Sequence, residues 1–220
     1  MNKVNTKAVR EQGVNILKNL RELVAIYVGN DRDISRIEGN GTFSREYKDG
    51  QIKTIKERTT AVARKSFDAL QQHLDDMLNV MRENDNVYDF SDPEFASCIA
   101  LISAAERPLS YETILGIAGK FLGNRQALLA LVEVAKGNNK DTLNKMIFNT
   151  EAEADRLQNR LIDLDINFPK SILSLPSFKD DIVRVVQACG EEFTESEKDL
   201  GADYQDIVVM QMRAAMGLPY

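Results

Sequence analysis

The chain has 220 residues, 43% hydrophobic and 28% charged, which is typical of a folded globular protein and too apolar for a wholly disordered one. Its 12 glycines and 5 prolines are too few for an all-β fold, and no apolar stretch approaches the ~18 residues of a membrane-spanning helix. The net charge of -6 is uneven: residues 1–65 carry 14 Lys and Arg against 8 Asp and Glu, and residues 66–220 carry 14 against 26. This asymmetry favours head-to-tail association or a partner of one sign, with solvated helix faces as the alternative.

The first predicted element is a helix over residues 5–28. Its apolar positions recur at steps of 4, 3, 4, 3 and 4, which places one stripe on a helix of 3.6 residues per turn: Val9, Gly13, Ile16, Leu20, Leu23 and Tyr27. The run Gly29-Asn30-Asp31 predicts its end, since Gly and Asn readily adopt the conformation that closes helices.

Residues 29–50 are the least regular part of the sequence. Four glycines fall here, together with Asn and Asp residues that favour turns. We expect a short irregular loop or mobile arm, and a hairpin turning at residues 48–51 is the alternative.

A second long helix is predicted from about Gln51 to residues 83–86. Six apolar residues again follow steps of 4 and 3: Ala63, Phe67, Leu70, Leu74, Met77 and Met81. A stripe offset by one residue holds Ile52, Ile55, Thr59 and Val62, which indicates a change of partner or a curve along the helix. Such stripes must be buried against other helices.

Three short helices should follow as a small bundle. The first begins at residues 91–94 and stops at Arg107-Pro108, and we expect it to be central because nearly all of its residues are apolar. Ser110 should cap the second, and Gly123-Asn124 should close it and open the third, which ends at residues 137–139.

The last part of the chain predicts three further helices. Asp141 should cap a long one whose stripe continues unbroken to Phe168. Ser177 should cap the next, which ends at Gly190, and a capping box at Thr194 should begin a final helix that runs to about residue 216. The apolar, Met-rich end of the chain is the candidate subunit interface, with an internal core as the alternative: Val208, Met212, Met216, Leu218 and Tyr220.

Together these elements predict an all-α fold. We expect a multi-helix bundle of about seven to eight helices, with three long heptad-patterned helices and a short irregular loop or hairpin at 29–50. Residues 1–90 should form a long-helix region with the loop or arm at 29–50, and residues 91–220 a compact helical bundle; one continuous domain is the alternative. Cys98 and Cys189 are expected to be buried free thiols.

One stretch of the chain combines a helix start, a turn and a second helix start with apolar residues at helical spacing. Its residues are Leu109-Ser110-Tyr111-Glu112-Thr113-Ile114, Ala118, Phe121, Asn124, Ala127, Leu128, Leu131, Ala135 and Asn138. This pattern resembles a helix-turn-helix pattern found in small helical proteins of phage and prophage virion and assembly gene clusters. The resemblance covers residues 109–138 and departs from the family pattern after Asn124, where this chain has Arg125-Gln126. It implies a structural or assembly role in a phage and supplies no active site.

Few residues point to chemistry. His73, the only histidine, has no further ligand at metal spacing, and Glu151, Glu153 and Asp155 point in divergent directions on a helix, as in a solvated acidic face. Glu191-Glu192-Phe193-Thr194-Glu195 is similar to the EExxE half-motif of all-α nucleotide pyrophosphohydrolases. The capping box, however, leaves the first two glutamates before the helix, and no matching glutamate follows near residues 207–220.

The function predicted from these patterns is a non-enzymatic helical oligomerising protein, a capsid- or tail-associated phage component in the bacterial cytoplasm or the virion. No metal or cofactor is expected, and the partners are further copies or other phage structural proteins. One alternative is a nucleic-acid-binding or regulatory module using basic residues within 43–65: Arg45, Lys48, Lys53, Lys56 and Arg58. A remote alternative is a metal-dependent all-α nucleotide hydrolase.

Overall fold

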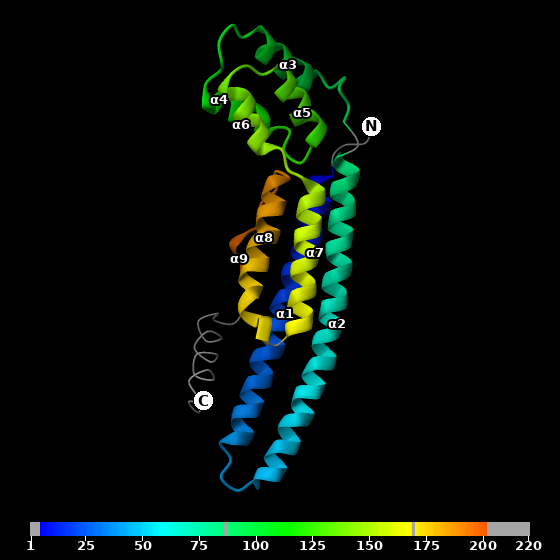
Figure 1. Cartoon of the computed structure of the whole chain (residues 1–220), viewed down its shortest axis with the longest axis vertical. Helices are drawn as coiled ribbons and strands as arrows, with labels where there is room; N and C mark the ends of the chain where they lie inside the picture. Colours follow the sequence, from blue (N-terminus) through cyan, green and yellow to red (C-terminus); the bar gives the residue numbers. More distant parts are fainter. Residues whose placement is uncertain (1–4, 86–87, 169, 202–220) are drawn as a thin grey trace. The chain divides into compact units, whose positions relative to one another are not determined.

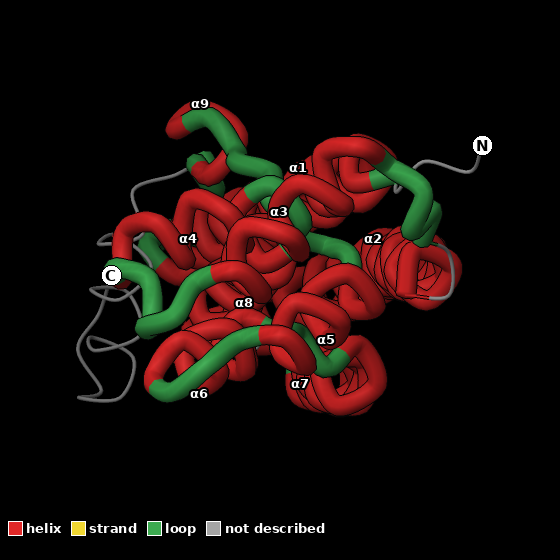
Figure 2. Tube along the Cα trace, turned by 90° about the horizontal axis from the view of Figure 1, so that it is seen from above, coloured by secondary structure: helices red, strands yellow, loops and turns green. Residues whose placement is uncertain are grey.

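A computed structural model describes residues 5–85, 88–168 and 170–201. These residues form helices and connecting loops with no strand, so the predicted all-α multi-helix bundle is confirmed (Figure 2). The elements are α1 (Thr6–Glu38), α2 (Arg45–Asp85), α3 (Pro93–Ala104), α4 (Tyr111–Gly119), α5 (Arg125–Val134), α6 (Asn138–Met146), α7 (Thr150–Asn167), the 3-10 helix η1 (Lys170–Ser174), α8 (Leu175–Ala188) and α9 (Glu195–Lys198).

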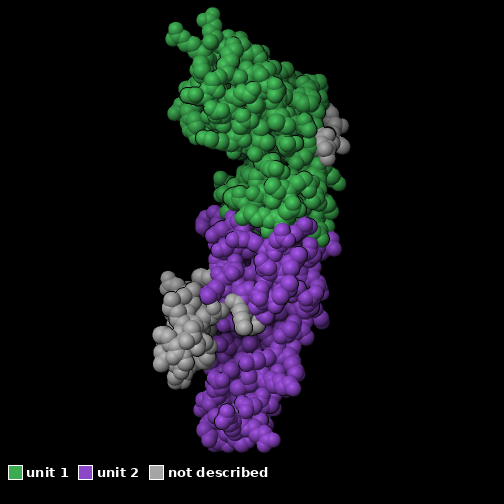
Figure 3. All heavy atoms as spheres, viewed as in Figure 1, with its two compact units in different colours: residues 1–13, 75–156, 182–193 green, residues 14–74, 157–181, 194–220 purple. Residues whose placement is uncertain are grey.

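The chain divides into two compact units, each built from separated segments (Figure 3). Unit 1 contains Met1–Gly13, Asp75–Arg156 and Ile182–Phe193, and unit 2 contains Val14–Leu74, Leu157–Asp181 and Thr194–Tyr220. Neither unit has a boundary near residue 90, where the sequence pattern places one.

In unit 1, helices α3 to α6 enclose one apolar core. The predicted caps are present: the Ser110 side chain accepts from the Thr113 amide, and the Asn124 side chain accepts from the Ala127 amide. Gly123 adopts a φ of 77°, which suits a residue that closes a helix. The core residues are Phe95, Cys98, Ile102, Ile114, Ile117, Ala118, Phe121, Ala127, Leu128, Leu131, Val132 and Leu143.

Helix α3 is not central, contrary to the sequence expectation. It buries Phe95, Cys98 and Ile102, but Leu101 is 51% exposed. Its alanines at 96, 100 and 104 are exposed as well. A helix of 12 residues needs to bury only one stripe, so an apolar composition all round does not ensure burial all round.

The other half of unit 1 joins the start of α1, the end of α2, the start of α7 and the end of α8. The Asn5 amide donates to Asn84 Oδ1 at 2.8 Å, and the Thr6 hydroxyl donates to Glu191 at 2.6 Å. Gly13 has a packing role, since a Cβ there would lie 2.7 Å from Cζ of the buried Phe193 ring. Both cysteines are buried and free, as predicted, and burial raises the pKa of Cys189 to about 12.

Unit 2 is built from α1, α2, α7 and α8. All six residues of the α2 stripe are buried across the two units, as the sequence pattern predicts, and within unit 2 Phe67 stacks edge-on against Phe168 of the α7–η1 link. An ion pair of 2.6 Å joins Arg64 to Asp165. The other buried apolar residues of this unit include Ile16, Leu17, Leu20, Leu23, Val24, Leu157, Leu161, Leu164, Ile172, Leu175 and Phe178.

The irregular segment expected at residues 29–50 is shorter than predicted, since only residues 39–44 form a loop between the two helices. Helix α1 continues through Gly29 to Glu38, and α2 begins at Arg45, where the Ser44 hydroxyl accepts from the Tyr47 amide. Gly29 and Gly50 both lie inside helices. A glycine within a helix costs about 1 kcal/mol relative to alanine, and pairing of the two long helices outweighs that cost.

Three other helix boundaries also differ from the prediction. The long stripe after Asp141 is split into α6 and α7, because Asn149 accepts from the Ala152 amide and starts a new helix. Gly137, and not Asp141, precedes α6, and α8 begins at Leu175, ahead of the expected cap Ser177.

The Thr194 capping box is present, and α9 ends at Lys198; residues 202–216 of the longer helix that the sequence predicts lie outside the described residues. The candidate interface residues Val208, Met212, Met216, Leu218 and Tyr220 lie outside the described residues.

Replacing Gly50 with alanine distinguishes a continuous α2 from a turn at residues 48–51. Nothing lies within 4 Å of a Cβ placed there, so Gly50→Ala should raise the free energy of unfolding by about 0.5–1 kcal/mol through helix propensity. Urea denaturation followed by circular dichroism measures the change. The matched control, Gly123→Ala, should destabilise, because its φ is positive and its Cβ would lie 2.9 Å from a backbone oxygen. A loss of stability in Gly50→Ala would support the turn.

Candidate functional site

The part of unit 2 with the least internal burial is the hairpin extension, defined as residues 29–62. Val28 and Ala63 are buried, but none of the residues between them is. Within unit 2, the extension continues past the ends of α7 and α8, so among the described residues α1 and α2 pair with each other there (Figure 1). When only two helices pair, each can bury its apolar stripe only on the side that faces the other helix.

Isoleucines mark the incomplete core of the extension. Ile34 and Ile37 on α1, and Ile52 and Ile55 on α2, are each half-buried. The α1 pair is spaced by three residues and so is the α2 pair, which keeps each pair on one side of its helix. These side chains are therefore arranged for burial, and most of their surface, though not all of it, is removed from water.

A groove of about 240 Å³ lies between α1 and α2 at the base of the hairpin extension. Ile26 and Ile55 are apolar and half-buried there, and Val62 is 43% exposed. Gly29 leaves open space, since nothing lies within 4 Å of a Cβ placed on it. The lining is Ala25, Ile26, Gly29, Asn30 and Asp33 from α1, and Ile55, Arg58, Thr59 and Val62 from α2.

The polar groups of the groove come from both helices. The Thr59 hydroxyl donates to Asn30 Oδ1 at 3.0 Å and joins α2 to α1. Asp33 and Arg58, of opposite charge, line the groove from opposite helices. Asp33 also lies 3.5 Å from the exposed guanidinium of Arg36. Two residues before Asp33, the pKa of Asp31 is raised by burial and, to a smaller extent, by the nearby Glu38.

The tip of the extension carries an exposed aromatic pair. Phe43 and Tyr47 have ring centroids 4.8 Å apart, and both rings are more than one-third exposed. Lys48 donates its Nζ to the Glu38 carbonyl at 2.7 Å and so connects the start of α2 to the end of α1.

Four of the five candidate nucleic-acid contacts share one side of α2, but acidic side chains lie among or beside them. Helical spacing places Arg45, Lys48, Lys53 and Lys56 within an arc of about 140° around α2, and Arg58 lies outside it. Asp49 falls within the same arc, and Lys53 lies 3.9 Å from Glu57. A nucleic-acid role for these residues stays a prediction.

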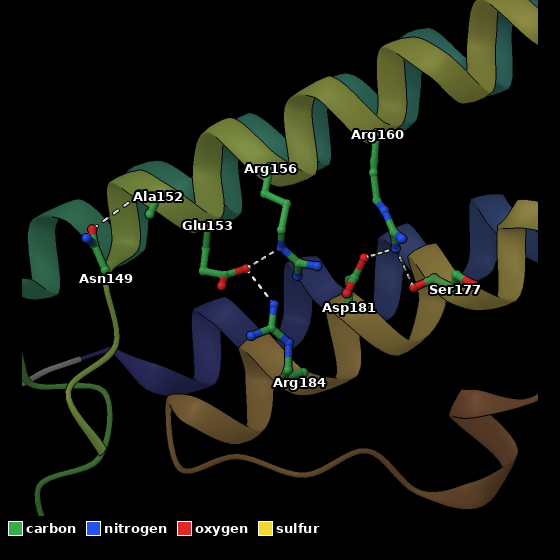
Figure 4. Close-up of polar contacts among 8 residues, drawn as sticks. All are labelled: Asn149, Ala152, Glu153, Arg156, Arg160, Ser177, Asp181 and Arg184. Carbon is green, nitrogen blue, oxygen red and sulfur yellow. Dashed lines mark hydrogen bonds and ion pairs between the residues drawn. The ribbon is translucent and has the colours of Figure 1, made fainter. Parts of the chain in front are cut away.

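The acids at the start of α7 are engaged by arginines, as Figure 4 shows for Glu153. Glu153 Oε2 accepts from Arg156 at 2.8 Å and from Arg184 of α8 at 2.6 Å, and its side chain is only 17% exposed. Glu151 accepts two hydrogen bonds from Arg82 of α2. The expected solvated face therefore fits Glu151 and Asp155, but not Glu153, which joins α7 to α8 within unit 1.

A comparable contact in unit 2 joins the second half of α7 to the start of α8. Arg160 forms an ion pair with Asp181, which is buried, and donates to the Ser177 carbonyl at 3.2 Å (Figure 4). These arginines have a structural role in fixing α8 against α7.

Other residues with possible chemistry are dispersed. Glu191 bonds to Thr6, the Glu192 carbonyl accepts from Arg10 at 2.8 Å, and both precede α9 as the capping box predicts. His73 is half-buried on α2. In the described part of the chain, no group of three or more His, Cys, Asp or Glu residues is placed to hold a metal ion.

The groove was not found from the sequence alone, although a signal for it exists. Ile52, Ile55, Thr59 and Val62 form the offset stripe on α2, and three of these residues line the groove. The α1 side of the groove could not be predicted, because Gly29 indicates a helix end in the sequence and α1 in fact continues through it.

Removal of the Glu153 charge should produce a pH-dependent loss of stability. Burial alone would raise its pKa, but the hydrogen bonds from Arg184 and Arg156 outweigh burial and hold the pKa below its usual value. The stabilisation is therefore present above the ordinary glutamate pKa and is lost as pH falls through the lower value in the folded protein. Glu153→Gln should lower the free energy of unfolding by about 1 kcal/mol at pH 7.

Urea titrations at several pH values between 3 and 7 measure this difference, which should shrink towards the acid end. The matched control is Glu151→Gln, whose side chain is 67% exposed and whose effect should be clearly smaller, because solvent screens an exposed ion pair. A difference that is independent of pH would contradict the assignment.

No helix in the described ranges is both long enough and apolar enough to cross a membrane. In comparisons with known proteins, no protein-family model, curated protein or solved structure matches this chain. The surface with the clearest geometric features is the hairpin extension with its groove.

Proposed function

We propose that this chain is a non-enzymatic helical protein that associates with further copies of itself and helps to build, or forms part of, a phage particle. The observation that supports the proposal most directly is the hairpin extension, which has no buried residue yet carries four half-buried isoleucines. Apolar helix faces left partly open in this way gain free energy when another helix covers them.

The ionisable groups support a structural role. The most sheltered acid at the start of α7, Glu153, is bound to two arginines, and buried Asp181 is bound to Arg160. Each of these contacts joins one helix to another, so the groups contribute to packing and alignment.

The phage setting of the proposal comes from the resemblance at residues 109–138. In the structure this stretch contains α4, its link to α5, and α5 with the caps Ser110 and Asn124. A role in the host cytoplasm or the finished virion follows from that setting, with other phage structural proteins as further partners.

The proposal predicts a defined species larger than a monomer. Sedimentation velocity over a range of about 1–100 µM, a range typical of weak protein contacts, should show a mass above 24.7 kDa. Removal of residues 208–220, which hold the predicted interface Val208, Met212, Met216, Leu218 and Tyr220, should reduce this association. Circular dichroism of the shortened chain is the control for folding. A chain that stays monomeric throughout, alone and with capsid or tail proteins of the phage, would rule the proposal out.

A further inference from the structure

We propose that the groove between α1 and α2 receives the same groove of a second copy, so that the two hairpin extensions form a four-helix contact. This inference rests on the proposed self-association and names a surface that contributes to it, separate from the candidate interface at residues 208–220. The groups involved are those of the groove, the neighbouring isoleucines and the oppositely charged pair Asp33 and Arg58.

The apolar part of the argument concerns what is still exposed. Val62 is 43% exposed, and Ile26 and Ile55, which line the groove with it, keep part of their surface in solvent. At Gly29 the groove has open space where a side chain would stand, so a second helix pair can approach closely there. A second hairpin would supply the two missing helices and convert a two-helix contact into a four-helix core.

The available area suits a reversible contact. Residues 45–62 of α2 extend for about 27 Å, and two packed helices present a face about 18–20 Å wide. Each copy would therefore bury about 500 Å², and the pair about 1,000 Å², which is at the lower limit for a specific interface. The contact should accordingly depend on protein concentration.

The charges select the arrangement of the two copies. Residues 29–38 carry two bases and three acids, and residues 45–62 carry five bases and three acids. A two-fold axis along the hairpin lays α1 of each copy over α2 of the other and brings Asp33 towards Arg58 of the second copy. A two-fold axis across the hairpin would instead lay α1 over α1 of the second copy, and would place side chains of like charge opposite each other. We therefore infer the axis along the hairpin.

Two other exposed surfaces are weaker candidates. The outer face of α3 around Leu101 carries one charged residue of that helix, Glu94, which already forms an ion pair with Lys120 of the same unit. The hollow of about 510 Å³ beside α7 and α8 is lined largely by polar residues, including Asn167, Ser171 and Ser174. Neither combines exposed apolar groups with facing charges of opposite sign, as the groove does.

Charge reversal tests the contact between copies. Asp33→Arg and Arg58→Asp should each weaken self-association at least about tenfold, because each places two like-charged pairs in the contact. An equimolar mixture of the two variants should restore it, since the Arg at 33 then meets the Asp at 58. The double variant D33R/R58D should restore the homodimer. Native mass spectrometry with one variant isotopically labelled identifies the mixed pair directly.

The controls separate this contact from folding and from net charge. Lys56→Asp makes the same charge change as Arg58→Asp on the same helix, but helical spacing places it about 160° away, so association should be unchanged. Thermal unfolding at low protein concentration reports whether each variant is folded.

If either single reversal associates like the wild-type chain, or if mixing fails to restore the pair, the groove is not the contact. The proposed function then still stands wherever the wild-type chain is oligomeric. If the pure wild-type chain is monomeric at every concentration, this contact is ruled out even where the groove binds another protein. Equal losses in Lys56→Asp and Arg58→Asp would also rule it out.

Discussion

A helix with an apolar stripe is stable only to the extent that something covers the stripe, and in unit 2 the helices have unequal lengths. Helices α1 and α2 continue beyond α7 and α8, so their inner ends are covered on several sides and their outer ends on one. Burial changes accordingly at Val28 and Ala63, although the helices themselves continue. The hairpin extension, its half-buried isoleucines and the groove all follow from this difference in length.

Much of the helical architecture could be predicted, because periodic burial and side-chain caps are local properties of the sequence. The stripe from Ala63 to Met81, the caps Ser110 and Asn124, and the capping box at Thr194 are all present. The predicted helix breaks were wrong where packing between segments far apart in the sequence outweighed a weak local preference. Gly29 and Gly50 favour breaks by about 1 kcal/mol each, and the pairing of α1 with α2 overcomes that preference.

Between α6 and α7 the error is the reverse, since the sequence predicts one continuous helix and the structure has two. The apolar spacing continues across residues 147–149, so periodicity alone indicated one helix, but Asn149 caps a new one and Leu143 belongs to the core around α3 to α6. The ion pair of Glu153 could not be predicted either, because its partner Arg184 lies 31 residues away in the chain. The groove joins residues 25–33 to residues 55–62, and a pairing of this kind is visible only once the fold has brought the two segments together.

The hydrogen bond between Thr59 and Asn30 has a consequence for how the two arms of the extension can move. Rows of isoleucine on facing helices tolerate sliding by one turn, because one branched aliphatic side chain packs much like the next. A single polar pair does not tolerate such sliding, because a shift of one turn, about 5.4 Å, would break the hydrogen bond between the two partners. The hydrogen bond between Thr59 and Asn30 therefore fixes the axial register of α1 against α2. This register keeps Asp33 of α1 and Arg58 of α2 at a constant offset along the hairpin extension.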